Sequence, residues 1–333
     1  MTQFVENLMN RASKLNKTIA LAEGTDVSAA KAAEILTKKG VCKVVLIGNE
    51  DEIKAKFPEI DFTGVSFDDP KTSDHRADYA NTLFELRKAK GMTEEQALNI
   101  VTTNNMFYAC VALKRGDVDG VVGGAVFSSA DVSRAAFQVI KAAPGISSVS
   151  SCFVMVPPED FKYKKYPAYI FSDCAVIPYP TSDQLSDIVV AAADSAKKIC
   201  EMEPKIAMLS FSTKGSAKHE AIDKVRAAYE KVKAEHPEIK VDGELQLDAS
   251  LVDSVAAQKA PGSEVAGQAN VLVFPNLDAG NIGYKIAQRF GNCMAIGPIM
   301  QGLALPVNDL SRGCVAEDIA AVAAITALQS VKE

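Results

Sequence analysis

The fold class is indicated by the stretch TIALAEGTDVSAAKAAEILTKKGVCKVVLIGN, residues 18–49. Its apolar beginning, 18–24, is typical of a buried strand, and the alanine-rich segment 26–40 is typical of a helix that ends at a glycine. A second apolar segment at 42–49 predicts another strand. A strand, a helix and a strand in this order form a βαβ unit, which normally belongs to a parallel sheet covered by helices.

The same alternation of strand and helix signals continues along the chain, which predicts an α/β protein. Further strands are predicted near 65–67 and at 119–126, 147–158, 167–180, 205–213, 241–251, 269–277 and 294–303. Helices are predicted at 1–17, 72–91, 93–116, 131–143, 181–202 and 214–237, and from about Val315 onward. Within this set Thr93 and Gln96 have the spacing of a capping box.

The length of 333 residues and a change of character after Pro144 and Gly145 suggest two domains. The last helix is too short to form a domain, so we expect it to pack back on the first one. This predicts a discontinuous α/β domain of residues 1–143 plus 296–333, and a second α/β domain of residues 144–295. Such a chain crosses twice between its domains, and the cleft between two domains is a favoured place for a ligand.

The charge and the cysteines of the chain argue against several classes of protein. A net charge of −6 gives no sign of a nucleic-acid partner. The seven cysteines are widely spaced and contain no C-x-x-C pair, which argues against a disulfide framework or a zinc site and predicts reduced core thiols. The N-terminal segment has no apolar signal core, and the longest apolar run, from Ile319, is shorter than the roughly 20 residues that span a bilayer. We therefore expect a soluble cytoplasmic protein with no membrane partner.

A polar stretch interrupts this apolar chain at residues 306–319, PVNDLSRGCVAEDI. Ser311 and Arg312 precede the predicted last helix, and Asp318 lies in its first turn. A helix N-terminus offers free N–H groups and a partial positive charge, and arginine offers paired donors suited to phosphate. One interpretation is a site that holds an anion and moves a proton. The other is that Glu317 and Asp318 merely interact favourably with the helix dipole, and the residue types alone leave both open.

Two strand-to-helix turns could bind an anionic substrate in the same way, through N–H groups at the start of a helix. The candidate groups are Thr213, Lys214, Gly215 and Ser216 in the turn 210–220, and Gly123, Gly124, Ser128, Ser129 and Arg134 in the turn 123–134. The alternative is that each turn merely caps a helix. The chain contains no full P-loop order, no G-x-G-x-x-G, no G-x-S-x-G and no H-E-x-x-H. Because the three histidines lie in charged helical stretches, we expect any proton transfer to fall to a carboxylate.

Longer blocks of the sequence are recognisable as a set. They are KLNKTIALAEGTD, FELRKAKGMT, STKGSAKHE, DGELQLDASLV, QKAPGSEVAGQANVLVFPNLDAGNIGYKIAQR and NDLSRGC. From about residue 4 to 331 the chain resembles the phosphate acetyltransferases of the phosphate acetyl/butyryltransferase family. The resemblance implies a two-domain isocitrate/isopropylmalate-dehydrogenase-like α/β fold with an interdomain cleft, and a homodimer. It also implies the reversible reaction of acetyl-CoA and phosphate to acetyl phosphate and coenzyme A, with no metal or redox cofactor.

The resemblance also assigns roles to particular residues. Ser311 and Arg312 match the S-R-G-C motif, Asp318 matches the aspartate in the following helix, and Arg87 and Arg134 match two further arginines. Asp318 is then expected to take the proton of the CoA thiol, and the thiolate to attack the carbonyl carbon of acetyl phosphate. Ser311 is expected to donate to the carbonyl oxygen as it gains charge. The three arginines are expected to hold the phosphate.

The pKa values of the aspartate and the thiol constrain this scheme. The pKa of a free aspartate is about 3.9 and that of a cysteine-like thiol about 8.5, so the proton transfer is uphill by about 6 kcal/mol. Partial burial would raise the pKa of Asp318, whereas a paired arginine would lower it. We therefore expect Arg312 to face the phosphate and the thiol rather than Asp318. The cysteine that some members of the family carry after a mid-chain Val-Pro is absent at 156–163, and Cys314 is expected to serve packing.

Three other functions are compatible with parts of these patterns. A phosphate butyryltransferase would perform the same chemistry in a larger acyl pocket, and one methylene is worth only about 1–3 kcal/mol. An NAD-dependent decarboxylating dehydrogenase would need metal-binding aspartates and a dinucleotide site, which the sequence does not offer. A non-catalytic regulator that binds CoA or an acyl phosphate would not need Ser311, Arg312 and Asp318 together.

Overall fold

The computed structural model describes residues 2–331, which form two compact units. The first unit runs to Pro144 and resumes at Leu303, and the second unit is Gly145–Gly302. Within the described residues no helix is long and apolar enough to cross a bilayer. All seven cysteines lie within the described residues, where none forms a disulfide, and five of them are buried.

The second boundary differs from the one expected at 295/296, which falls inside strand β10 (Met294–Gln301). This strand pairs with β5 (Ser150–Val156) from Met294 to Gln301, with an irregularity between Ile296 and Ile299. The backbone hydrogen bonds of the whole strand are therefore made within the second unit, and the chain leaves that unit only after Gly302.

The first unit contains a five-stranded parallel sheet in the order β11-β4-β1-β2-β3. The strands are β1 (Thr18–Leu21), β2 (Lys43–Ile47), β3 (Val65–Asp68), β4 (Gly120–Val122) and β11 (Val307–Asn308). Parallel pairing of β1 with β2, with a helix between them in the chain, confirms the predicted βαβ unit. Strand β11 was not predicted, because two residues are too few to show a strand period and only the edge of β4 defines it.

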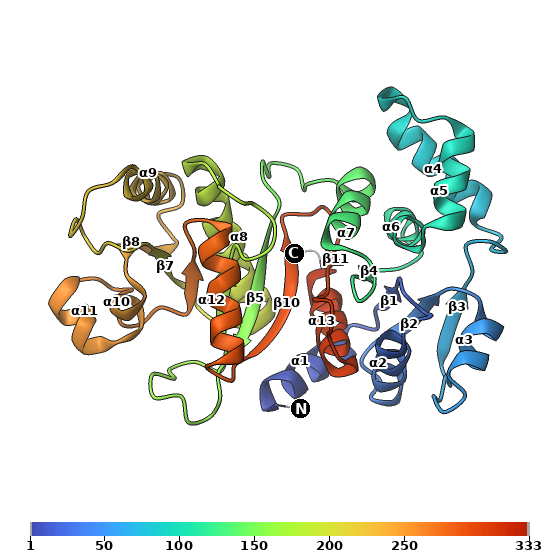
Figure 1. Ribbon diagram of the computed structural model, residues 1–333, viewed down its shortest axis with the longest axis horizontal. Coiled ribbons are helices and arrows are strands. Elements are labelled where there is room, and N and C mark those ends of the chain that lie inside the picture. The colour runs from blue at the N-terminus through green and yellow to red at the C-terminus, as the bar shows by residue number, and fades with distance from the viewer. Residues whose placement is uncertain (1, 332–333) are drawn as a thin grey trace. The chain divides into compact units, whose positions relative to one another are not determined.

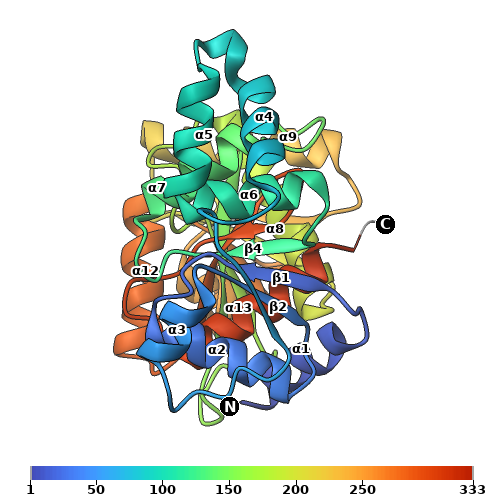
Figure 2. The same cartoon turned by 90° about the vertical axis from the view of Figure 1, so that its right-hand side faces the viewer.

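Helices cover both faces of this sheet (Figures 1 and 2). They are α1 (Gln3–Ser13), α2 (Val27–Lys38), α3 (Glu50–Lys56), α4 (Arg76–Arg87), α5 (Glu94–Thr103), α6 (Asn105–Arg115), α7 (Ser129–Ala135) and α13 (Ala316–Gln329), with the helical turns η1 (Lys88–Lys90) and η2 (Ala136–Ile140). The last helix, α13, packs with α1 and α2 on one face and contacts β4 and β1. On the other face α6 lies against β4, and the pair α4 and α5 extends beyond it.

One predicted helix, 93–116, proves to be two. Helix α5 ends at Thr103, and Asn104 then accepts a hydrogen bond from the backbone N–H of Phe107 (3.1 Å), which starts α6. An asparagine side chain that caps a new helix competes with continuation of the old one. The capping box of Thr93 and Gln96 at the start of α5 is confirmed.

The second unit contains a six-stranded mixed sheet in the order β10-β5-β6-β9-β7-β8. Its other strands are β6 (Tyr169–Ser172), β7 (Lys205–Leu209), β8 (Lys240–Leu245) and β9 (Val271–Val273), and its helices are α8 (Ser182–Cys200), α9 (Glu220–Glu235), α10 (Leu247–Leu251), α11 (Asp253–Lys259) and α12 (Leu277–Arg289). Strands β10, β5 and β6 pair antiparallel, and the remaining pairs are parallel.

All six strands of this unit are shorter than predicted, and the two largest differences arise where turn or helical structure replaces the strand. The segment 167–180 is a strand only to Ser172, because the carboxylate of Asp173 accepts N–H groups of residues 175–177 and folds the chain into a turn. The segment 241–251 leaves the sheet after Leu245 and continues as α10.

Candidate active site

The carboxyl ends of three neighbouring strands meet at one edge of the first unit's sheet. Glu23 follows β1, the turn 123–128 follows β4, and Asp309 follows β11, and these strands are adjacent in the order β11-β4-β1. In open parallel sheets, ligands bind outside the carboxyl ends of the strands. The loop that carries Ser311 and Arg312 starts at this same edge.

The turn after β4 wraps around the carboxylate of Glu23. This buried carboxylate accepts four backbone N–H groups, those of Gly124 (2.9 Å), Ala125 (2.8 Å), Val126 (2.7 Å) and Phe127 (2.6 Å). The turn was predicted to bind an anion, and its N–H groups do so, but the anion is a side chain of the protein. Sequence reasoning missed Glu23, although a charged residue near the end of the apolar strand predicted at 18–24 was a signal.

The side chains predicted in this turn lie just beyond the bound carboxylate. Ser128 caps α7 and donates a hydrogen bond to Asp131 (2.6 Å), and Arg134 pairs with the same aspartate (2.9 Å). Ser129 and Arg134 are exposed. Hydrogen bonds from Ser128 and the charge of Arg134 lower the pKa of Asp131. Ser129 and Arg134 are therefore accessible to solvent next to the strand ends, with Arg134 paired to Asp131.

The loop between β11 and α13 presents Ser311 and Arg312 to solvent. Arg312 forms no ion pair with any residue in the described part of the chain, so its guanidinium is not engaged by Asp318. Helix α13 begins at Ala316, close to the predicted start, with Val315 as its N-cap.

Asp318 occupies the first turn of α13 and accepts a hydrogen bond from the backbone N–H of Val315 (3.1 Å). Burial raises the pKa of the Asp318 carboxyl above its usual range, the Val315 N–H partly opposes this rise, and the charge of Glu317 adds to it. The side chain thus caps its helix and is also a stronger base than a free aspartate. The two interpretations left open by the sequence are therefore compatible with each other.

Cys314 lies in the same loop but is a poor nucleophile. Burial and the negative charge of Asp318 raise the pKa of its thiol to about 12, and Asp26 and Glu23 contribute further. A thiol with this pKa is neutral at physiological pH, and the thiolate is the reactive form. The environment fits the packing role expected for this cysteine.

Arg87 lies apart from that loop. It ends α4 and, with Lys90, Gln96 and Asn99, lines a pocket of about 320 Å³ that contains neither Ser311, Arg312 nor Asp318. Its Nε is buried and has no hydrogen-bond partner among the described residues. Helices α4 and α5 lie on the face of the sheet opposite to α13 (Figure 2). No hydrogen bond or ion pair within residues 2–331 joins Arg87 to the S-R-G-C loop, and its role at the phosphate stays a prediction.

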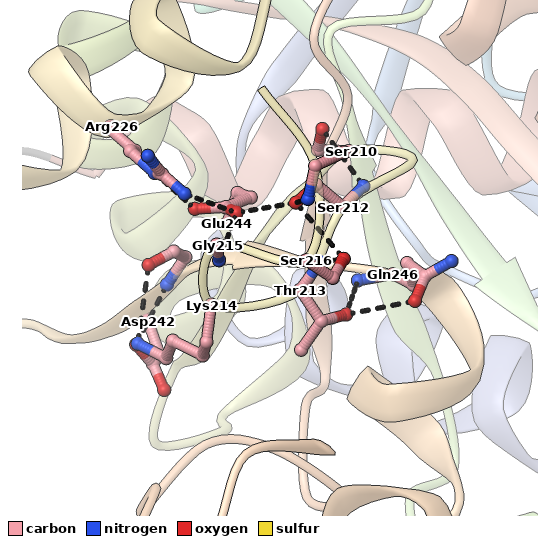
Figure 3. A network of polar contacts seen from close by, with 12 residues as sticks. Ser210, Ser212, Thr213, Lys214, Gly215, Ser216, Arg226, Asp242, Glu244 and Gln246 are labelled. Carbon is pink, nitrogen blue, oxygen red and sulfur yellow. Dashed lines mark hydrogen bonds and ion pairs between the residues drawn. The ribbon is translucent and has the colours of Figure 1, made fainter. Parts of the chain in front are cut away.

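The predicted anion cradle of the second unit is also filled by side chains of the protein (Figure 3). The buried carboxylate of Glu244 accepts hydrogen bonds from the Gly215 N–H (2.9 Å), the Ser212 hydroxyl (2.8 Å) and the Arg226 guanidinium (2.8 and 3.0 Å). Asp242 pairs with Lys214.

The two remaining members of this cradle are engaged as well. The Thr213 N–H donates to the Ser216 hydroxyl (3.1 Å), and the Thr213 hydroxyl lies 2.9 Å from the Gln246 backbone N–H. A contact of residues 213–216 with phosphate would therefore require these internal partners to be exchanged. Within residues 2–331 no group of three or more His, Cys, Asp or Glu side chains is placed to hold a metal ion.

Comparisons with known proteins agree along nearly the whole chain. A family model described as phosphate acetyl/butaryl transferase matches residues 3–327. The phosphate acetyltransferase of Acetivibrio thermocellus is 50% identical, over 98% of this chain and 98% of that protein. A solved phosphotransacetylase from Streptococcus pyogenes superposes with a TM-score of 0.91 at 41% identity, covering 99% of each chain.

A more distant neighbour shares the fold alone. The 4-hydroxythreonine-4-phosphate dehydrogenase of Klebsiella pneumoniae has a TM-score of 0.55 at 12% identity, over 95% of this chain and 100% of that one. The extent of the family match and the identity to full-length relatives lead to one conclusion: the chain belongs to the phosphate acetyl/butaryl transferase family.

Proposed function

We propose that this chain catalyses the reversible transfer of an acetyl group from acetyl-CoA to inorganic phosphate, which gives acetyl phosphate and coenzyme A. The observation that carries the proposal is the 50% identity to a phosphate acetyltransferase over 98% of both chains. The substrates are acetyl-CoA, coenzyme A, acetyl phosphate and phosphate. The scheme requires no metal and no redox cofactor.

In the proposed mechanism Asp318 is the general base. Its half-buried carboxyl, with a raised pKa, takes the proton of the CoA thiol and thereby reduces the uphill cost of forming the thiolate. The thiolate attacks the carbonyl carbon of acetyl phosphate, the carbon–oxygen bond to phosphate breaks, and phosphate leaves. The exposed hydroxyl of Ser311 donates to the carbonyl oxygen as negative charge develops there.

Arginine side chains are assigned to the phosphate. Arg312 is exposed and unpaired among the described residues, so its paired donors are free for a phosphate group. Arg134, with Ser128 and Ser129, lies at the neighbouring strand end and is assigned to the same anion. Arg87 is assigned to the phosphate as well, as the resemblance implies; its buried Nε has no hydrogen-bond partner among the described residues.

Residues 213–216 stay candidate substrate contacts. The chain is assigned to the cytoplasm. The resemblance to isocitrate/isopropylmalate-dehydrogenase-like proteins adds a substrate cleft between two α/β domains, which a crystal structure with coenzyme A and phosphate would test. A preference for butyryl phosphate is the nearest alternative, and a regulator without activity is a remote one.

A homodimer is supported by an apolar stripe on α12. Ile282 and Ile286 on α12 and its C-cap residue Phe290 are 57%, 53% and 90% exposed and recur at a spacing of four residues, which places them along one side of the helix and its C-terminal end. Contiguous exposed apolar side chains of this kind mark interaction sites in soluble proteins. We assign this stripe to contact with a second copy of the chain.

The first experiment is thioester formation from coenzyme A with acetyl phosphate or butyryl phosphate. We expect faster turnover of acetyl phosphate, and a loss of roughly 10²- to 10⁴-fold in kcat for Asp318→Asn, as is typical when a general base is removed. Glu317→Gln is the matched control, because Glu317 is an exposed acid in the same helical turn. A faster reaction with butyryl phosphate would identify the chain as a phosphate butyryltransferase. Full activity of Asp318→Asn would exclude Asp318 as the general base. If neither substrate gave a thioester, the proposal would be refuted.

A further inference from the structure

Asp309 is a buried acid that the proposed mechanism does not use. Its side chain is only 3% exposed, and its Oδ1 has no hydrogen-bond partner among the described residues. Burying a carboxyl group without satisfying it costs free energy of folding. Residues that violate local rules of stability in this way are found at functional sites.

The position of Asp309 joins three segments at the carboxyl edge of the sheet. It directly follows β11 and precedes Ser311 by two residues. Its Oδ1 packs so closely on the backbone of Gly124 that a Cβ there would lie only 2.2 Å from it. The backbone nitrogen of Leu310 lies at the same contact, 2.7 Å from the position of that Cβ.

Glu23 approaches the same turn from the side of β1. Gly124 donates its N–H to Glu23 and lies against Asp309, so the turn is held between two buried carboxyl groups. Burial raises the pKa of Asp309 to about 6; the Ser129 hydroxyl and the Leu310 N–H oppose the rise, and the charge of Glu23 adds to it. Glu23 is the charged side chain that faces Asp309 in the described part of the chain.

We propose that Asp309 is a positioning residue for acyl transfer, whose carboxylate fixes the S-R-G-C loop against the turn after β4. The ionised carboxylate offers acceptors to both the Leu310 N–H and the Ser129 hydroxyl, and so sets the start of the segment that carries Ser311 and Arg312. A protonated carboxyl or an amide offers fewer acceptor sites, so the loop is held less firmly. The inference rests on the proposed function, because it assumes that this loop serves the transfer.

The test compares wild type with Asp309→Asn in the thioester assay at about pH 7.5 and about pH 5.5, on either side of the Asp309 pKa. The matched control is Asp119→Asn, because Asp119 lies before β4 at the opposite end of that strand and pairs with Lys17. At the higher pH we expect Asp309→Asn to lower kcat by roughly tenfold or more, with the KM for coenzyme A changed by less than about twofold. At the lower pH the ratio of the two kcat values shrinks, because the protonated wild-type side chain resembles the amide.

The outcomes separate a positioning role from a structural one. The expected ratio that shrinks with falling pH, together with a melting temperature of Asp309→Asn no lower than that of wild type, supports positioning. The positioning role alone is overturned if the ratio of the wild-type kcat to the Asp309→Asn kcat does not change with pH. It is also overturned if Asp309→Asn has the same kcat as an active wild type. A wild-type protein that forms no thioester overturns the proposed function and the positioning role with it.

Discussion

At the scale of single residues, the environment decides which side chains can react. Asp318 and Cys314 are both partly buried near other negative charges, and the pKa of each group is raised. A raised pKa makes a carboxylate a better base, whereas it leaves a thiol protonated and unreactive. The same surroundings therefore favour proton transfer by Asp318 and disfavour nucleophilic attack by Cys314.

A prediction at this scale concerns Arg312, whose guanidinium is exposed and unpaired among the described residues. Arg312→Lys keeps the charge but removes the planar pair of donors that matches a phosphate, so we expect the KM for acetyl phosphate to rise about tenfold. Steady-state kinetics with acetyl phosphate varied would measure this. Arg76→Lys is the control, since Arg76 is exposed and its guanidinium donates to the backbone carbonyl of Lys71 (2.7 Å). An unchanged KM would remove Arg312 from the phosphate site.

At the scale of elements, two strand-to-helix turns are organised by buried glutamates. Glu23 holds the turn after β4, and Glu244 on β8 holds the turn after β7. Backbone N–H groups in such turns bind any anion, and an internal carboxylate occupies them permanently. Sequence patterns identified both turns as anion sites, but the donor groups alone could not show that the anion is part of the chain.

The Glu244 site leads to a prediction about stability and pH. Burial alone would raise the pKa of Glu244, but the bonds from Arg226, Gly215 and Ser212 outweigh it and lower the pKa to about 2. Because the folded pKa lies below the unfolded one, the site stabilises the fold above about pH 4.5, and this contribution is lost as the pH falls toward 2. Arg226→Met leaves the buried carboxylate of Glu244 without its charged partner, so it should lower the free energy of unfolding at neutral pH, and by less in acid.

Urea unfolding of both proteins at a series of pH values would check this prediction. Lys231→Met is the control on the same helix, because its partner Asp183 is 74% exposed and such surface pairs contribute only about 0–1 kcal/mol. If both variants lost the same free energy of unfolding, the burial of Glu244 would not strengthen its ion pair with Arg226. A loss for Arg226→Met that grows in acid would contradict the sign of the effect.

At the scale of the whole molecule, each unit has a hydrophobic core of its own. In the first unit the core surrounds α6, whose residues from Met106 to Leu113 are all buried, and in the second it surrounds the sheet near Phe153 and Leu272. The chain enters the second unit once and returns, so that α13 packs against α1 and α2 on the face of the first sheet opposite to α6. The polar loop before α13 therefore reaches the strand ends only through this return.

The prediction at this scale concerns the apolar stripe on α12. Phe290→Glu places a charge where the side chain is 90% exposed, so we expect it to convert a dimer to a monomer without lowering the melting temperature of the monomer. Size-exclusion chromatography with light scattering would measure the mass. Leu247→Glu is the control, because Leu247 is 51% exposed on another helix of the same unit. A wild-type protein of monomeric mass would refute the assignment.

The sequence by itself determined the α/β class, the βαβ unit at 18–49, the capping box at Thr93 and the family, because these depend on local periodicity and on long blocks of residues. It also located the loop of Ser311 and Arg312 at the start of the last helix. Tertiary structure alone decided that Glu23 and Glu244 fill the anion-binding turns and that Asp309 packs on Gly124. The physical reason is that these contacts join strand ends that are distant along the chain, and strand order, which brings them together, leaves no local pattern in the sequence.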